Sequence, residues 1–224
     1  MNSWETQVKS KERVSNHGEV FTREVQVNAM LDLVKVETER IESRFLEPAC
    51  GTGNFLVKIL ERKLNAVEEE TRYKGGFPNY ELKSIIALSS IYGVELLEDN
   101  VEECRERLFE LWNQEYTRHC KNESKDRCRK VAAFILQRNI LCGDALTLLT
   151  NDNTPIIFSE WEFMDNDIVI RRDYRFDELL KNQDMQPTLD MANNWHYDEE
   201  INGLIPNPIK EYPPMDYLEV SECG

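Results

Sequence analysis

The segment Phe45-Leu46-Glu47-Pro48-Ala49-Cys50-Gly51-Thr52-Gly53-Asn54-Phe55-Leu56 decides the fold of this chain. Its first residues have the character of a short strand, and the apolar residues after Gly53 recur with helical spacing. The two glycines therefore stand at a turn from a strand into a helix, where a ligand can approach bare backbone. In α/β folds such turns lie at the carboxyl edge of the sheet, which is where these folds bind ligands.

Two common nucleotide-binding patterns are excluded by the residues around this turn. A dinucleotide fingerprint requires a third glycine at position 56, where the chain has Leu56. A phosphate-binding loop requires Gly-Lys-Ser or Gly-Lys-Thr, and the sequence contains neither. The flanking Glu-Pro-Ala-Cys and Asn-Phe-Leu make the motif far more specific than a lone Gly-x-Gly.

Strands and helices alternate on both sides of the motif. The hydrophobic pattern predicts strands at 44–47, 91–95, 140–142 and 155–158, and helices at 22–42, 54–70, 98–118 and 124–137, with a helical turn at 84–89. This order predicts an α/β fold with a parallel-stranded sheet flanked by helices. We expect a folded domain over residues 1–165, with an N-terminal helical element at 16–42, and an irregular acidic tail over 166–224.

The glycine segment resembles the motif Asp-Pro-Ala-Cys-Gly-Ser-Gly-x-Phe-Leu, which binds S-adenosylmethionine (SAM) in class I N6-adenine DNA methyltransferases. Glu47 replaces the aspartate and Thr52 the serine. The resemblance implies a Rossmann-like methyltransferase fold, here in a shorter, truncated form. It also implies that SAM contacts Glu47, Pro48, Ala49, Cys50, Gly51, Thr52, Gly53, Asn54 and Phe55.

Three other segments follow the order of that family. Upstream, Phe21 and Thr22 resemble an element that lies over the methionine end of SAM, although Arg23 replaces its proline. Glu95 ends the second expected strand, where the resemblance assigns it to the ribose hydroxyls. Asp144 follows the third strand, and the resemblance places it and Ala145 beside the adenine ring.

The catalytic motif of the family, Asp/Asn/Ser-Pro-Pro followed by an aromatic residue, is not recognisable. In the family its polar side chain accepts the adenine amino protons and its aromatic ring stacks on a flipped base. Ser159 and Trp161 stand at the right distance as its polar and aromatic members, but both prolines are missing. Because the sequence contains no Pro-Cys dipeptide, a cytosine-C5 methyltransferase is excluded.

Charge bears on how such a protein would use DNA. The formal net charge is −15: residues 1–150 hold 22 basic and 25 acidic side chains, and residues 151–224 hold 5 and 17. Phosphate contacts require Lys and Arg, so we expect a separate recognition subunit to hold the DNA. Without an apolar leader, a membrane span or paired cysteine and histidine ligands, the sequence predicts a cytoplasmic protein with no membrane and no metal.

Three functions remain open from the sequence. The first is an adenine-N6 DNA methyltransferase of a restriction-modification or mobile-element system. The second is a SAM-binding regulatory module that has lost catalysis. The third is an acidic decoy, in which the C-terminal charge imitates DNA.

Overall fold

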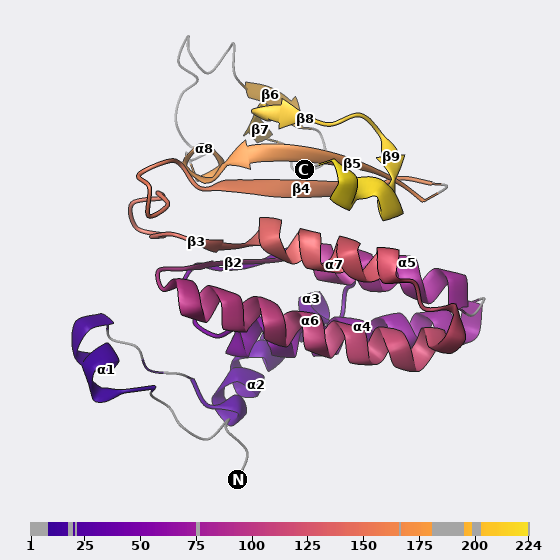
Figure 1. Cartoon of the computed structure of the whole chain (residues 1–224), viewed down its shortest axis with the longest axis horizontal. Coiled ribbons are helices and arrows are strands. Elements are labelled where there is room, and N and C mark those ends of the chain that lie inside the picture. The colour runs from indigo at the N-terminus through magenta and orange to yellow at the C-terminus, as the bar shows by residue number, and fades with distance from the viewer. Residues whose placement is uncertain are drawn as a thin grey trace. The chain divides into compact units, whose positions relative to one another are not determined.

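A computed structural model describes residues 9–17, 20, 22–74, 77–165, 167–180, 195–198 and 203–223 (Figure 1). The chain divides into two compact units, Met1–Cys142 and Gly143–Gly224. Each unit is described separately below.

The first unit is built on a parallel sheet of three short strands. These are β1 (Phe45–Glu47), β2 (Ile91–Glu95) and β3 (Ile140–Cys142), in the order β1-β2-β3. Leu46 pairs with Tyr92, and Val94 pairs with Leu141. The predicted parallel sheet and its first three strands are confirmed.

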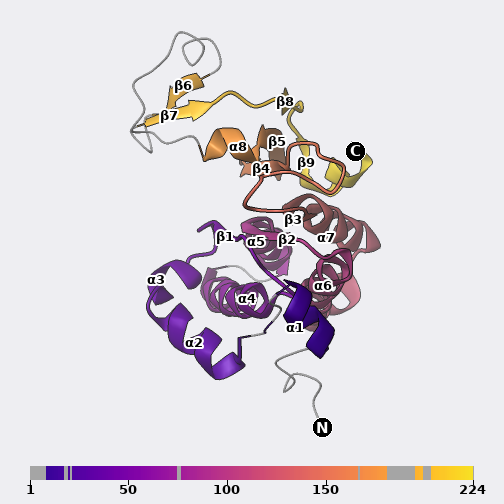
Figure 2. The same ribbon diagram turned by 90° about the vertical axis from the view of Figure 1, so that its left-hand side faces the viewer.

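Each crossover between these strands consists of two helices. The first crossover holds α4 (Asn54–Lys74) and α5 (Phe77–Ser89), and the second holds α6 (Glu98–Cys120), the 3-10 turn η2 (Lys121–Glu123) and α7 (Asp126–Asn139). Figures 1 and 2 show α4 and α6 in one layer, whereas α5 and α7 lead directly into β2 and β3. The turn predicted at 84–89 is therefore wrong in extent, because α5 has 13 residues, and this helix accounts for the long gap between the glycine turn and Glu95.

The N-terminal part of the unit is helical but broken. It contains α1 (Lys11–His17), α2 (Glu24–Asp32) and α3 (Lys35–Thr38). The single helix predicted over 22–42 is wrong, because Val34 has a non-helical backbone (φ −119°, ψ 31°) and separates α2 from α3. Arg23, rather than Thr22, stands at the N-cap of α2.

A buried lysine fastens the amino ends of β1 and β2. Lys63 is fully buried on α4, and its Nζ donates to the carbonyl oxygens of Arg40, Ile41 and Ser43 and to the Ser90 hydroxyl. Burial lowers the pKa of Lys63 to about 7. These bonds fix one edge of the sheet, and the glycine turn lies at the other.

The second unit is largely antiparallel. Its hairpin joins β4 (Ile157–Phe163) and β5 (Ile168–Arg175), and β5 also pairs with β8 (Lys210–Glu211) and β9 (Met215–Asp216). The remaining elements are α8 (Phe176–Leu179), β6 (Trp195–Asp198), β7 (Gly203–Pro206) and η3 (Tyr217–Glu222).

Two sequence predictions are wrong here. The fourth strand runs over 157–163 in an antiparallel hairpin, and the described residues after 166 include strands where an irregular tail was expected. Arg171 and Asp173 explain the error: both are buried in β5 and pair with each other, so a charged sequence forms an inner strand. No helix in the described part of either unit is long and apolar enough to cross a bilayer.

Candidate cofactor site

The turn after β1 has the backbone that its two glycines permit. Gly51 and Gly53 have φ values of +52° and +85°, in the left-handed region that side chains with a Cβ rarely adopt. The Gly53 N–H donates to Cys50 O at 2.8 Å, and the Cys50 N–H donates to Val94 O at 3.0 Å. The turn is therefore closed on itself and fastened to the neighbouring strand.

Close packing beneath the turn also requires glycine. A Cβ on Gly53 would lie 2.6 Å from Cys104 Sγ, and one on Gly93 in β2 would lie 2.9 Å from Cys50 Sγ. A hydrogen bond with Cys104, together with burial, strongly raises the pKa of Cys50. Cys50 therefore stays a neutral thiol that packs the turn, and thiolate chemistry is excluded for it.

The carboxylate of Glu95 is held directly against the glycine turn. Its Oε2 accepts the Gly51 N–H at 2.9 Å, and its Oε1 accepts the Leu97 N–H at 3.1 Å and the Asn100 side-chain amide at 3.3 Å. The structure thus brings together two predicted site residues that lie 44 positions apart. Asn100, which is buried, escaped the sequence reasoning because nothing in its local pattern marks it.

Arg107 on α6 fastens the other side of the turn. Its guanidinium donates to the carbonyl oxygen and hydroxyl of Thr52 and to Asn54 Oδ1, at 3.0 Å and 2.9 Å for the last two. The Asn54 amide donates to Thr22 O at 3.1 Å, so the upstream element also reaches the turn. Arg107 has no sequence signature, and Phe21 lies outside the described residues.

The surface of the turn combines exposed backbone with one perturbed carboxyl. Pro48 and Ala49 are exposed, and Phe55 is half-buried at the start of α4. Burial raises the pKa of Glu47, and a hydrogen bond from the Ala49 N–H offsets part of that effect. The turn can therefore present the exposed residues Pro48 and Ala49 and the carboxyl groups of Glu47 and Glu95 to a polar ligand.

The family comparison agrees with this geometry. The family model for the DNA-methyltransferase domain of MmeI matches residues 21–167. The chain belongs to this family. Comparisons with curated proteins and with solved structures give no match. The matched range contains the glycine turn and Glu95, and membership of the MmeI methyltransferase family confirms the resemblance to DNA methyltransferases.

Asp144 and Ala145 lie in the second unit of this MmeI-family domain. The Asp144 backbone N–H donates to Leu149 O at 2.9 Å, and its carboxylate accepts the Leu146 N–H at 2.8 Å. Asp144 therefore caps its own turn, which fixes the direction of its side chain. Its assignment to the adenine ring stays a prediction, as does that of Ala145.

Ser159 and Trp161 lie inside β4, and both are buried. The Ser159 hydroxyl donates to Asp173 at 2.7 Å and accepts a hydrogen bond from Arg171 Nε at 3.1 Å. The Arg171 guanidinium lies 5.8 Å from the centre of the Trp161 ring. Both side chains thus take part in the interior of the hairpin, and their catalytic assignment stays a prediction.

Proposed function

We propose that this MmeI-family chain is a SAM-dependent DNA methyltransferase that methylates adenine at N6. The observation that carries the proposal is the direct hydrogen bond between the Glu95 carboxylate and the N–H of Gly51. A carboxylate and a glycine turn at the ends of adjacent parallel strands are the pair that nucleoside cofactors need in Rossmann-like folds.

The hydrogen-bond inventory of Glu95 fits a ribose. A carboxylate has about four acceptor sites, and three donors on the chain contact this one. Both oxygens are oriented by backbone or buried groups, so a ribose hydroxyl would meet a rigid acceptor. Gly51 and the exposed Ala49 would lie along the methionine part of SAM, and Asp144 would accept a hydrogen bond from the adenine amine.

Bound SAM would supply the methyl group, and the chain would supply orientation. The target adenine amine would accept that methyl group and release one proton. In this proposal the Ser159 hydroxyl accepts a hydrogen bond from the adenine amino group, and Trp161 stacks on the flipped base. A separate subunit would supply most phosphate contacts, because residues 1–150 have no excess of basic side chains and a charge balance of −3. We place this activity in a cytoplasmic restriction-modification or mobile-element system.

The environment of Ser159 favours a second candidate, a SAM-binding module without catalysis. Asp173 and Arg171, which form hydrogen bonds with its hydroxyl, belong to one buried network. Ser159 itself is only 2% exposed. Restoring the two prolines of the family motif would also remove donors from the middle of a strand. In this case SAM, or its absence, would regulate a partner.

Calorimetric titration with SAM tests the binding step shared by both candidates. Glu95→Ala and Asp144→Ala should each weaken binding by at least tenfold, since each removes a charged acceptor. Glu98→Gln, an exposed acid three residues beyond Glu95, is the matched control and should bind as the wild type does. A folded chain that does not bind SAM would refute both candidates.

A methylation assay then separates the two candidates. The chain is incubated with SAM and DNA, with and without its co-expressed partner subunit, and N6-methyladenine is measured. Product formation that Ser159→Ala abolishes supports the methyltransferase. SAM binding with no product under either condition supports the inactive module.

A further inference from the structure

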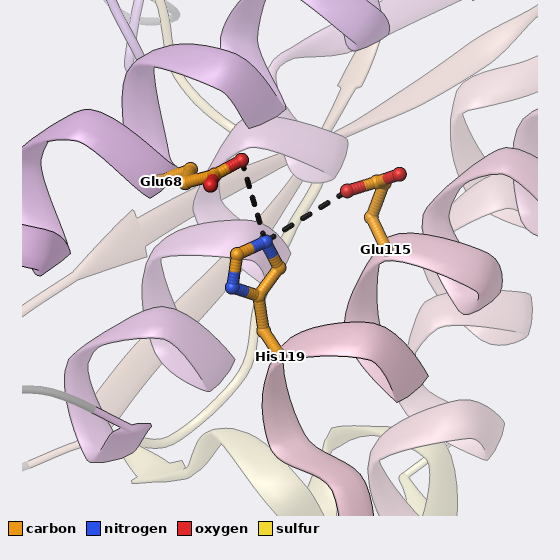
Figure 3. A group of neighbouring side chains, drawn as sticks. All are labelled: Glu68, Glu115 and His119. Atoms are coloured by element: carbon orange, nitrogen blue, oxygen red, sulfur yellow. Dashed lines mark ion pairs between the residues drawn. The ribbon is translucent and has the colours of Figure 1, made fainter.

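Three polar side chains converge near the C-terminal ends of α4 and α6. The glycine turn lies at the N-terminal end of α4. Glu68 belongs to α4, and Glu115 and His119 lie one turn apart on α6. His119 Nε2 lies 3.6 Å from a Glu68 oxygen and 3.8 Å from a Glu115 oxygen, and one ligand atom of each residue lies within 4.8 Å of the others (Figure 3). Figure 3 shows both carboxylates pointing toward the same ring nitrogen.

Two buried polar atoms, one in this cluster and one beside it, lack a hydrogen-bond partner among the described residues. His119 Nε2 is buried and makes no hydrogen bond with any described residue. The same holds for the hydroxyl of Tyr80, a residue that is only 2% exposed and whose ring stacks on His119 at 4.0 Å. Burial raises the pKa of Tyr80, and the stacking of its ring on His119 places this residue beside the cluster. Unsatisfied buried groups of this kind point to a missing ion or water.

We propose that His119 Nε2 and one carboxylate oxygen each from Glu68 and Glu115 bind a divalent transition-metal ion of the zinc type. One imidazole and two carboxylates form a three-ligand set that such ions accept, with water in the fourth position. Bonds of about 2 Å place neighbouring ligands about 3.3 Å apart. The 3.6 Å and 3.8 Å from His119 Nε2 to the two carboxylates require only a small contraction, and all three ligand atoms lie within 4.8 Å of one another. The ion would tie α4 to α6, and its binding does not depend on the proposed SAM site.

Arg118 is the internal competitor for this ion. Its guanidinium pairs with Glu68 at 2.8 Å and, at closer range, with Glu115. Arg72 also pairs with Glu68, at 2.8 Å. Two carboxylates and two arginines are already neutral together, so a bound dication must displace the exposed Arg118 side chain. Metal binding and the Arg118 ion pairs are therefore mutually exclusive.

The protonation state of His119 suits a ligand. Burial, and then the positive charge of Arg118, lower the pKa of His119 below its usual value. The neutral imidazole, which this direction of shift favours, is the form that binds metals.

Titration of the full chain with Zn²⁺ at pH 7 tests the proposal. We expect one equivalent to bind, with a rise in melting temperature as required by linkage. His119→Ala and Glu115→Gln should each weaken this site at least tenfold, whereas the exposed controls His196→Ala and Glu106→Gln should not. Repeating the titration with Co²⁺ reports the ligands, because nitrogen and oxygen ligands give no thiolate-to-metal charge-transfer band.

Arg118→Gln tests the proposal without removing any of the three proposed ligands. Removing the competing cation should raise the Zn²⁺ affinity several-fold, which a merely structural ion-pair cluster would not produce. Unchanged or weaker Zn²⁺ affinity in Arg118→Gln would overturn the proposal, as would a thiolate band with Co²⁺. SAM titrated in parallel keeps the two proposals separate, since its affinity should not change in any of these variants.

Discussion

The glycine turn and the β4–β5 hairpin use polar groups in opposite ways. At the turn, Glu95 is oriented by neighbouring donors, and Pro48 and Ala49 are exposed. In the hairpin, Arg171, Asp173 and Ser159 are buried and bond chiefly to one another, and the Tyr212 ring lies 4.2 Å from the Arg171 guanidinium.

Under the proposed function, the difference separates a surface that binds a ligand from an interior that stabilises itself. Oriented but incompletely used acceptors, such as those of Glu95, can bind another molecule without rearrangement. A closed network such as that of Arg171 specifies one packing and has few sites left to offer. The comparison predicts that substitutions in the hairpin reduce stability, whereas those at the turn chiefly reduce cofactor affinity.

The largest effect is expected for Arg171→Met in the hairpin. This substitution leaves the Asp173 charge buried without its bidentate partner, which costs about 3–5 kcal/mol of unfolding free energy. Denaturant unfolding measures the loss. The control is Arg172→Gln, whose partners Glu162 and Glu211 lie at the surface and which should cost about 1 kcal/mol or less. SAM affinity lost in proportion to stability would contradict the comparison.

An intermediate effect is expected for Gly53→Ala at the turn. The added Cβ must adopt φ +85° and would approach Cys104 Sγ to 2.6 Å, for a combined cost of about 2–3 kcal/mol. SAM affinity should fall more than tenfold, because the turn backbone shifts. In the double variant Gly53→Ala/Cys104→Ala the contact is relieved and the φ strain is not, so only part of the stability should return. Full recovery, or none, would show that one of these two causes is absent.

Local pattern predicted most of the first unit. The strands β1, β2 and β3 and the long helices follow from hydrophobic periodicity, and the glycine turn follows from a contiguous motif. Glu95 was found because it ends a strand next to the turn. Arg107 and Asn100 were missed because each lies on α6 and acts through side-chain hydrogen bonds to the turn or to Glu95, which leave no periodic signal.

Composition was the source of the errors in the second unit. An acidic, asparagine-rich sequence reads as irregular, because unpaired charges rarely enter a core. The pairing of Arg171 with Asp173 reverses that inference, because residues two positions apart lie on the same face of β5. The cluster of Glu68, Glu115 and His119 escaped for a related reason, since only two of its members are close in sequence and the third comes from another helix.

The smallest effect, and the one that most sharpens the comparison, is expected for Glu47→Gln at the turn. Burial raises the pKa of Glu47, so its ionised form destabilises the folded state slightly. This cost is complete above the raised folded pKa and disappears as the pH falls below the ordinary value near 4.5. Glu47→Gln should therefore unfold with a free energy higher by a few tenths of a kcal/mol at pH 7, because solvent screens a half-buried group. The two proteins should converge in stability near pH 4.

SAM affinity should meanwhile fall, since Glu47 occupies the acidic position of the cofactor motif. A gain in stability together with a loss of SAM affinity is expected of a residue on a ligand-binding surface. No substitution in the Arg171 network should produce this combination. Equal stability of Glu47→Gln and wild type from pH 4 to pH 7 would remove Glu47 from this account.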